Sequence, residues 1–326
     1  MMIQSDGTRL IAPFLLSPAL HVLVWGGRKF ATHLDKPLPT DARHGEAWEL
    51  HDTATVEGGA LDGRTIADLV ATFGSDLIGA DADPADGMPL LIKFLDANDW
   101  LSVQVHPDDA DCRTMEGLPR GKNEAWYVVD AEADAALING VQDGATIDRI
   151  GSAIAANTLA PLLHHVPVRA GDALYMKAGT IHALGPGLLI YEVQQSCNVT
   201  YRLYDWGRMG LDGQPRPLHI DKALRVADPR LCAEVTHADT AVSVSVFDTP
   251  HFITVRHTLT DTALPIETDG RFHAITVLDG AMTVTTDVGS VAVPRGRTAF
   301  VPACIDQFTL SGSGTALRSA QPAHAR

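Results

Sequence analysis

Hydrophobic positions along the chain gather mainly in short runs of four to seven residues, the length of β-strands. Short apolar runs bounded by Gly, Pro, Asn or Asp predict strands. Helical spacing is confined to residues 65–78 and 147–163. Many short strands joined by such turns predict a mainly β protein, a sandwich or barrel of the jelly-roll kind. In the first two thirds of the chain, the predicted strands cover residues 90–95, 101–106, 125–129, 173–176, 188–194 and 200–203.

The helical signal vanishes after about residue 235, and strand and turn patterns alternate from there on. Asp279-Gly280, between apolar residues 273–278 and 281–286, predicts a hairpin turn. The end of the chain, from about Ser319, is expected to fray. We therefore predict two domains, a larger one over residues 1–235 with helical insertions and a smaller all-β one over residues 236–326.

Composition and charge narrow the function classes. The 326 residues are 45% hydrophobic and 20% charged, which is typical of a folded soluble protein. With 25 basic and 40 acidic residues the net charge is −15, which argues against binding to nucleic acid or anionic membranes but leaves room for a small anionic substrate beside local cations. No membrane span, signal peptide or CxxC spacing is found, so we expect a cytoplasmic protein. We also expect a monomer or homodimer.

Three segments carry a set of potential metal ligands. Gln104 and His106 are two residues apart on one predicted strand and share a face. Glu124 stands in the same relation to Lys122, and His182 follows the turn at Gly179. Two imidazoles, a carboxylate and an amide oxygen suit Zn²⁺, and Mn²⁺, Fe²⁺ or Co²⁺ would also accept them. The alternative is that these are separate surface or core residues, because sequence spacing does not prove that the segments meet.

The spacing around His182 resembles the second cupin motif, G-x5-P-x-G-x2-H. Gly171, Gly179 and His182 occupy their places, and Lys177 stands in the proline position. In the smaller domain Gly296 and Pro302 repeat the spacing, but the His position falls on Gln307. We therefore expect two cupin-like jelly-roll barrels, the second one without metal.

Longer segments resemble the type I mannose-6-phosphate isomerases (phosphomannose isomerases) of the short bacterial form. The resemblance covers most of residues 10–235. It is carried by the sequences at residues 25–27 (WGG), 45–50 (GEAWEL), 89–109 (PLLIKFLDANDWLSVQVHPDD), 121–127 (GKNEAWY), 179–184 (GTIHAL) and 191–208 (YEVQQSCNVTYRLYDWGR).

This resemblance implies a zinc-dependent aldose–ketose isomerase of carbohydrate metabolism. It would interconvert mannose 6-phosphate and fructose 6-phosphate through an enediol, with one Zn²⁺ per chain. The implied zinc ligands are Gln104, His106, Glu124 and His182. The implied catalytic or substrate-binding residues are Arg202, Lys122, Glu192 and Asn198.

Two positions depart from the family pattern. Asn198 replaces a usual Asp, so any role that needs a carboxylate there is in doubt. Gly121 replaces a His that the longer enzymes are proposed to use for ring opening. The alternative function is therefore a weak or inactive sugar-phosphate-binding cupin with a regulatory role.

Single residues also keep structural alternatives. Glu192 would serve as the proton-transfer base or as a buried structural carboxylate. Arg202 would bind phosphate or pair with Asp205 on the surface. Lys93 could support the site from behind its ligands, but it is expected instead to extend out of its sheet or to pair with Asp96.

Overall fold

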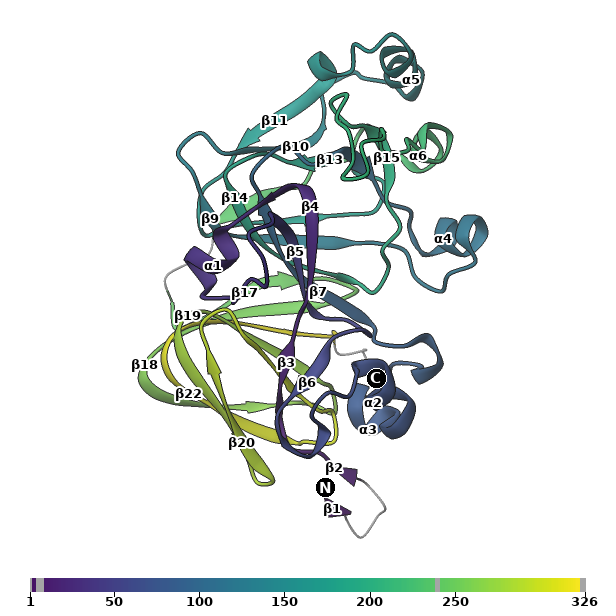
Figure 1. The fold of residues 1–326 in the computed structure, drawn as a ribbon. Coiled ribbons are helices and arrows are strands. Elements are labelled where there is room, and N and C mark those ends of the chain that lie inside the picture. The colour runs from purple at the N-terminus through teal and green to yellow at the C-terminus, as the bar shows by residue number, and fades with distance from the viewer. Residues whose placement is uncertain (1, 4–8, 238–240, 323–326) are drawn as a thin grey trace.

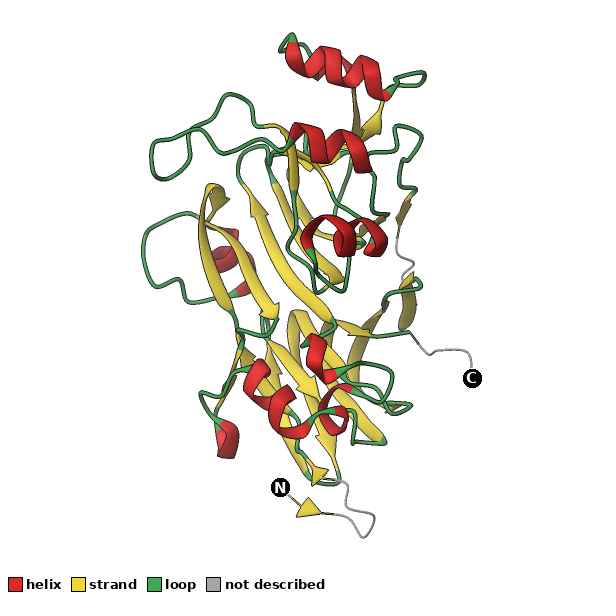
Figure 2. Cartoon of the chain, turned by 90° about the vertical axis from the view of Figure 1, so that its right-hand side faces the viewer, coloured by secondary structure: helices red, strands yellow, loops and turns green. Residues whose placement is uncertain are grey.

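The computed structural model describes residues 2–3, 9–237 and 241–322. Figure 1 shows two β units stacked along the long axis of the molecule, and Figure 2 shows that the helices lie on the outside of both. The first unit consists of a seven-stranded and a five-stranded sheet, and the second is built on an eight-stranded sheet. The predicted fold class, mainly β with cupin-like units, is confirmed. A two-stranded ribbon, β1 (Met2–Ile3) and β2 (Arg9–Leu10), precedes them.

The seven-stranded sheet is the central layer of the molecule. Along β14, Leu188 and Ile190 join one hydrophobic cluster, whereas Leu189, Tyr191 and Val193 join another that reaches the second unit. All positions of β7 and β14 are buried, because both faces of the sheet are covered. The order is β16-β12-β9-β14-β7-β5-β4, with bounds β4 (Ala19–Gly27), β5 (His44–Leu50), β7 (Leu90–Ala97), β9 (Glu124–Ala131), β12 (Asp172–Met176), β14 (Leu188–Gln195) and β16 (Val235–His237).

The five-stranded sheet completes the first unit. Its order is β11-β10-β13-β8-β15, with bounds β8 (Val103–Val105), β10 (Ala136–Val141), β11 (Leu163–Pro167), β13 (His182–Leu184) and β15 (Tyr201–Tyr204). The predicted strands at 101–106 and 200–203 correspond to β8 and β15, within a few residues at each end.

Both predicted helices are shorter than expected. The helix from residue 65 starts at a Thr65–Asp68 capping box and is divided into α2 and α3 by Gly74, whose φ is +53°. The helix from residue 147 ends at Ala155. Three more helices, α1, α4 and α6, have six to eight residues, fewer than the roughly 11–18 over which helical periodicity can be recognised. The bounds are α1 (Lys29–Leu34), α2 (Ile66–Phe73), α3 (Ser75–Ile78), α4 (Asp109–Glu116), α5 (Ile147–Ala155) and α6 (Ile220–Val226), with 3-10 turns at Gly59–Leu61, Pro84–Asp86 and Ala160–Leu162.

The second unit has long strands where the sequence predicts shorter ones. The predicted hairpin at Asp279-Gly280 is wrong, because β19 runs straight through it with a register shift between Val277 and Asp279. The shift leaves Leu278 as the extra residue of a bulge, and Gly280 pairs with Gly314 directly after it. Gly280 has a φ of +71°, and a Cβ there would lie 2.1 Å from the Ser313 carbonyl oxygen, so only glycine fits this position. The expected fraying is wrong at its start, since β22 continues to Ala320 and Ser319 is buried, and residues 323–326 lie outside the described residues.

The N-terminal region contributes two strands to this second sheet. Its order is β17-β18-β22-β19-β21-β3-β6, and β20 pairs with β19. The predicted domain boundary between residues 235 and 236 stays a prediction. Strand pairing places β3 and β6, from the N-terminal region, in the second unit. The bounds are β3 (Phe14–Ser17), β6 (Thr55–Glu57), β17 (Ser243–Asp248), β18 (Ile253–Glu267), β19 (His273–Thr286), β20 (Gly289–Pro294), β21 (Thr298–Val301) and β22 (Gln307–Ala320).

Within the described residues, no helix has both the length and the apolar character needed to cross a bilayer.

Candidate active site

The fold brings three of the four predicted metal ligands together between the two sheets of the first unit. His106 follows β8, Glu124 begins β9 and His182 begins β13. Each offers a ligand atom, and these atoms all lie within 4.8 Å of one another. All three side chains are buried. Segments that are separate in the sequence thus converge on one point.

The hydrogen bonds of the two histidines leave their outer nitrogens open. His106 Nδ1 lies 2.8 Å from the Val199 carbonyl oxygen, and His182 Nδ1 lies 2.9 Å from that of Thr180. A carbonyl only accepts, so each Nδ1 carries the proton and each Nε2 presents a lone pair, as in metal-binding histidines.

The atoms that face one another lack hydrogen-bond partners. His106 Nε2 and Glu124 Oε1 are buried and make no hydrogen bond among the described residues, whereas Glu124 Oε2 forms an ion pair with Lys122. Glu124 Oε1 lies 3.1 Å from His182 Nε2, and Glu124 Oε2 lies 3.6 Å from His106 Nε2. Buried polar atoms without partners are costly, and several aimed at one point fit a bound cation.

Gln104 is placed beside this group. It pairs directly with His182 across β8 and β13, and its amide nitrogen lies 3.3 Å from His182 Nε2. Ser102 Oγ lies 3.4 Å from the amide oxygen. A half-turn of the amide exchanges its nitrogen and oxygen, so Gln104 can offer an oxygen from the same position. Two imidazoles, a carboxylate and this amide fit the donor preference of Zn²⁺.

Lys122 holds the carboxylate of this group in its charged form. Its Nζ lies 2.9 Å from Glu124 Oε2. Burial acts to raise the pKa of Glu124, but Lys122 and the two histidines outweigh it and hold that pKa well below the usual value. Burial, with the charge of Lys122, lowers the pKa of His106 to about 3. The imidazole is therefore neutral and able to act as a ligand at neutral pH.

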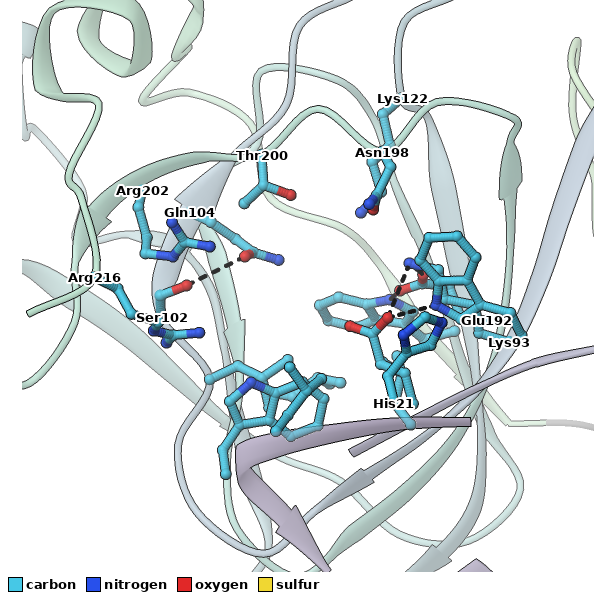
Figure 3. A pocket seen from close by; sticks show the side chains of 18 of the residues that line it. His21, Lys93, Ser102, Gln104, Lys122, Glu192, Asn198, Thr200, Arg202 and Arg216 are labelled. Carbon is cyan, nitrogen blue, oxygen red and sulfur yellow. Dashed lines mark hydrogen bonds and ion pairs between the residues drawn. The ribbon is translucent and has the colours of Figure 1, made fainter. Parts of the chain in front are cut away.

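A cleft of about 410 Å³ opens in front of the metal-ligand group, between the two sheets. Figure 3 shows its polar lining in two groups that face each other, one around Arg202 and Gln104 and the other around Glu192 and Lys93. The labelled lining residues are His21, Lys93, Ser102, Gln104, Lys122, Glu192, Asn198, Thr200, Arg202 and Arg216.

Glu192 lies in a row of side chains that crosses the seven-stranded sheet. It is directly opposite Trp126 on β9 and Lys93 on β7. The Trp126 indole N–H donates to Glu192 Oε2 at 2.9 Å, and Lys93 Nζ lies 3.3 Å from Oε1. Burial, and then the charge of Glu124, raise the pKa of Glu192. This carboxylate is thus a stronger base than an exposed one.

The expected pairing of Lys93 with Asp96 is wrong. Lys93 is buried, contacts Glu192 and lies 3.8 Å from Glu46. Asp96 accepts a hydrogen bond from the Lys29 backbone N–H at 2.5 Å instead. An odd spacing of three places two strand residues on opposite faces, so the alternation of β7 predicts this outcome.

The other end of the cleft carries positive charge. Arg202 on β15 is directly opposite Gln104 on β8. Asp205 binds Arg208 and Arg216, so the alternative pairing of Asp205 with Arg202 is not found. Arg216 and His219 also line the cleft, and our sequence reading missed them. They follow β15 in a loop with no strand periodicity, and no spacing connects them to the metal ligands.

Two family models match the chain. One, described as "Phosphomannose isomerase type I, catalytic domain", matches residues 14–135. The other, described as "Mannose-6-phosphate isomerase, cupin domain", matches residues 245–321. The matches fall on the two β units.

Curated proteins and a solved structure resemble the chain along most of its length. The mannose-6-phosphate isomerase of Streptococcus mutans is 32% identical over 307 residues, covering 92% of this chain and 95% of that protein. A probable mannose-6-phosphate isomerase of Bacillus subtilis is 38% identical over 220 residues, covering 66% and 68%. A crystal structure of a mannose 6-phosphate isomerase from Bacillus subtilis superposes with a TM-score of 0.86 at 26% identity, covering 95% and 99%.

Proposed function

Because this chain belongs to the type I mannose-6-phosphate isomerase family and is an aldose–ketose isomerase, we propose that it interconverts mannose 6-phosphate and fructose 6-phosphate with one Zn²⁺ per chain. The observation that supports the zinc site is the pair of buried atoms His106 Nε2 and Glu124 Oε1, which make no hydrogen bond among the described residues and lie beside His182 Nε2. They lie immediately behind a cleft that presents both cations and carboxylates.

Gln104, His106, Glu124 and His182 would hold the ion. When bound, Zn²⁺ would act as a Lewis acid on the oxygens of the substrate's C1 and C2. The backbone carbonyls of Val199 and Thr180 orient the two imidazoles from behind, which favours a fixed ligand geometry.

Glu192 is the proposed base for the proton transfer. The reaction removes a proton from C2 and returns one to C1 on the same face of an enediol, so one carboxylate with a raised pKa can do both. Trp126 and Lys93 hold the two oxygens of Glu192 in place, so the carboxylate would stay near both C1 and C2 during the proton transfer.

The remaining predicted residues are proposed to bind the substrate. Burial would lower the pKa of Lys122, but Glu124 and Glu192 raise it and keep the ammonium protonated. Lys122 therefore supplies positive charge where oxyanion charge develops. Arg202 binds the phosphate. Asn198 lines the cleft and can hydrogen-bond a sugar hydroxyl, but its amide cannot act as an acid or base. The cytoplasmic location and the monomeric or dimeric state stay predictions.

A coupled assay on mannose 6-phosphate tests this proposal. The protein is stripped with a chelator, reloaded with Zn²⁺ and assayed at each stage, together with Glu192→Gln and the matched control Glu132→Gln on the surface. We expect turnover to follow zinc content, and Glu192→Gln to keep its zinc but lose about 10²- to 10⁴-fold in kcat. If the zinc-loaded protein binds the sugar phosphate without turnover, the regulatory alternative is favoured instead.

A further inference from the structure

We infer that Arg216 and His219, together with Arg202, form the phosphate-binding end of the cleft and select phosphorylated sugars. This inference rests on the proposed function, because it assigns the phosphate of that substrate. All three side chains line the cleft. Figure 3 shows Arg202 and Arg216 on the side opposite Glu192 and Lys93.

Arg216 is anchored in a fixed orientation. Its Nε donates to Asp205 Oδ2 at 2.7 Å and its Nη2 donates to Asp205 Oδ1 at 2.5 Å. This two-point contact uses one edge of the guanidinium and leaves Nη1 without a hydrogen bond among the described residues. A planar guanidinium held from behind is well suited to donate to an anion in front of it.

Arg202 has donors that the protein does not use. Its Nη1 donates to the Pro217 carbonyl oxygen at 3.2 Å, but its Nε has no hydrogen-bond partner among the described residues. No carboxylate among the described residues forms an ion pair with Arg202. Burial and the nearby charge of Arg216 both lower the pKa of Arg202, so an anion between the two guanidiniums would relieve an existing repulsion.

His219 adds a third donor by its tautomer. The Arg202 backbone N–H donates to His219 Nδ1 at 3.2 Å, so in the neutral ring the proton is on Nε2. The His219 backbone N–H donates to the Arg202 carbonyl oxygen at 2.8 Å, which ties the loop to β15. Burial, with the charge of Arg202, lowers the pKa of His219, which favours this neutral form.

Arg208 provides an internal comparison. It binds the same Asp205 through Nη2 at 2.8 Å, but its Nη1 donates to Asp99 and to the Trp100 carbonyl oxygen, and it does not line the cleft. Two arginines thus share one carboxylate, and only Arg216 lines the cleft. A phosphate at Arg202 and Arg216 would leave the sugar to extend toward Gln104 and Glu192, where the proposed chemistry takes place.

Calorimetric titration of inorganic phosphate into the zinc-loaded protein tests the assignment without requiring turnover. Arg216→Gln is compared with the matched control Arg208→Gln, and zinc content and circular dichroism are recorded for both. We expect Arg216→Gln to weaken phosphate binding, and to raise the KM for mannose 6-phosphate, by about tenfold or more. Arg208→Gln should leave both values within about threefold of the parent, because Arg208 contacts Asp205, Asp99 and the Trp100 carbonyl oxygen but does not line the cleft.

His219→Phe serves as a second variant if Arg216→Gln does not fold, and it should weaken phosphate binding by about threefold to tenfold. Normal phosphate binding by a folded Arg216→Gln, or equal losses in the Arg216 and Arg208 variants, would overturn the inference. Failure of the proposed function is separate from this result: the parent protein would then bind phosphate through Arg216 but show no isomerase turnover with zinc.

Discussion

The interiors of the two β units differ most in their buried carboxylates and lysines. Among the described residues of the second unit, the buried ionisable side chains are His257, Arg271 and His273. Between the sheets of the first unit lie buried charged groups, among them Lys93, Lys122, Glu124 and Glu192. The second unit packs instead on an apolar cluster that includes Val277 and Phe308. The related glycine motifs differ in the same way, since His182 is buried in the first unit and Gln307 is exposed in the second.

In our proposal the first unit holds the active site, and the second unit contributes mainly to the stability of the fold. Buried charges contribute little net stability even when they are paired, because their desolvation offsets their attraction. Apolar burial stabilises by about 25 cal/mol per Å². We therefore expect substitutions in the first interior to change activity more than stability, and those in the second to do the reverse.

The largest expected effect is on activity, from His182→Ala in the first unit. The variant removes one imidazole from the group formed with His106 and Glu124, so zinc content should fall to background and kcat/KM by at least about a thousandfold. Metal analysis of the purified protein and the coupled assay measure both quantities.

His165→Ala is the matched control, because that histidine is exposed on β11 and contacts Trp100 away from the cleft. It should keep both zinc and activity. A His182→Ala protein that retains its metal and normal rates would contradict the assignment of this ligand.

The site residues that the sequence predicts lie on strands or within three residues of a strand end. The two-residue period places Gln104 and His106 on one face, and it would also have placed Lys93 in the cleft had the alternation been followed along β7. Arg216 and His219 lie in a loop, where no period indicates direction, and only the folded chain shows that they face the cleft. The catalytic and binding roles themselves stay predictions.

For the fold, the sequence predicts the elements better than their ends and connections. Asp279-Gly280 is a good turn sequence, yet pairing of β19 with β22 on both sides of it makes a bulge more favourable than a hairpin. The pairing of β3 with β21 is equally hidden, because some 280 residues separate partners such as Leu16 and Thr298 and no local pattern encodes such a contact.

Phe308→Ala tests the second unit and should give the next largest effect. The ring is 1% exposed within the apolar cluster, so its removal should lower the free energy of unfolding by about 3–5 kcal/mol. Denaturant unfolding measures this change, and zinc content and kcat should stay normal at temperatures where the variant is folded. Phe308→Leu, which keeps most of the volume, should lose less than about 1.5 kcal/mol. Lost activity at unchanged stability would break the comparison.

Making the first interior resemble the second gives a smaller effect of opposite sign. The double variant Lys93→Met, Glu192→Leu removes one positive and one negative charge that contact each other at 3.3 Å. We expect the free energy of unfolding to stay unchanged or to rise by about 1–4 kcal/mol, as for other buried ion pairs replaced by apolar residues.

Turnover by this double variant should be lost, because Glu192 is the proposed base, while zinc binding remains. The single variant Glu192→Leu is the control, since it leaves Lys93 with Glu46 at 3.8 Å as its nearest carboxylate and should be destabilised. A clear loss of stability in the double variant would show that the charged cleft stabilises the first unit after all.

The smallest expected effect concerns the contact between the two units. Tyr191 Oη lies 2.8 Å from Ser319 Oγ, which lies 2.8 Å from Thr254 Oγ1, and all three residues are buried. Tyr191→Phe leaves the Ser319 hydroxyl with Thr254, so it should cost only about 1 kcal/mol in the free energy of unfolding. Ser319→Ala removes both contacts and should cost more. Tyr191 and Glu192 are adjacent on β14 and point to opposite faces, so kcat should not change. A drop in kcat for Tyr191→Phe would therefore mean that the second unit positions the cleft as well as stabilising the fold.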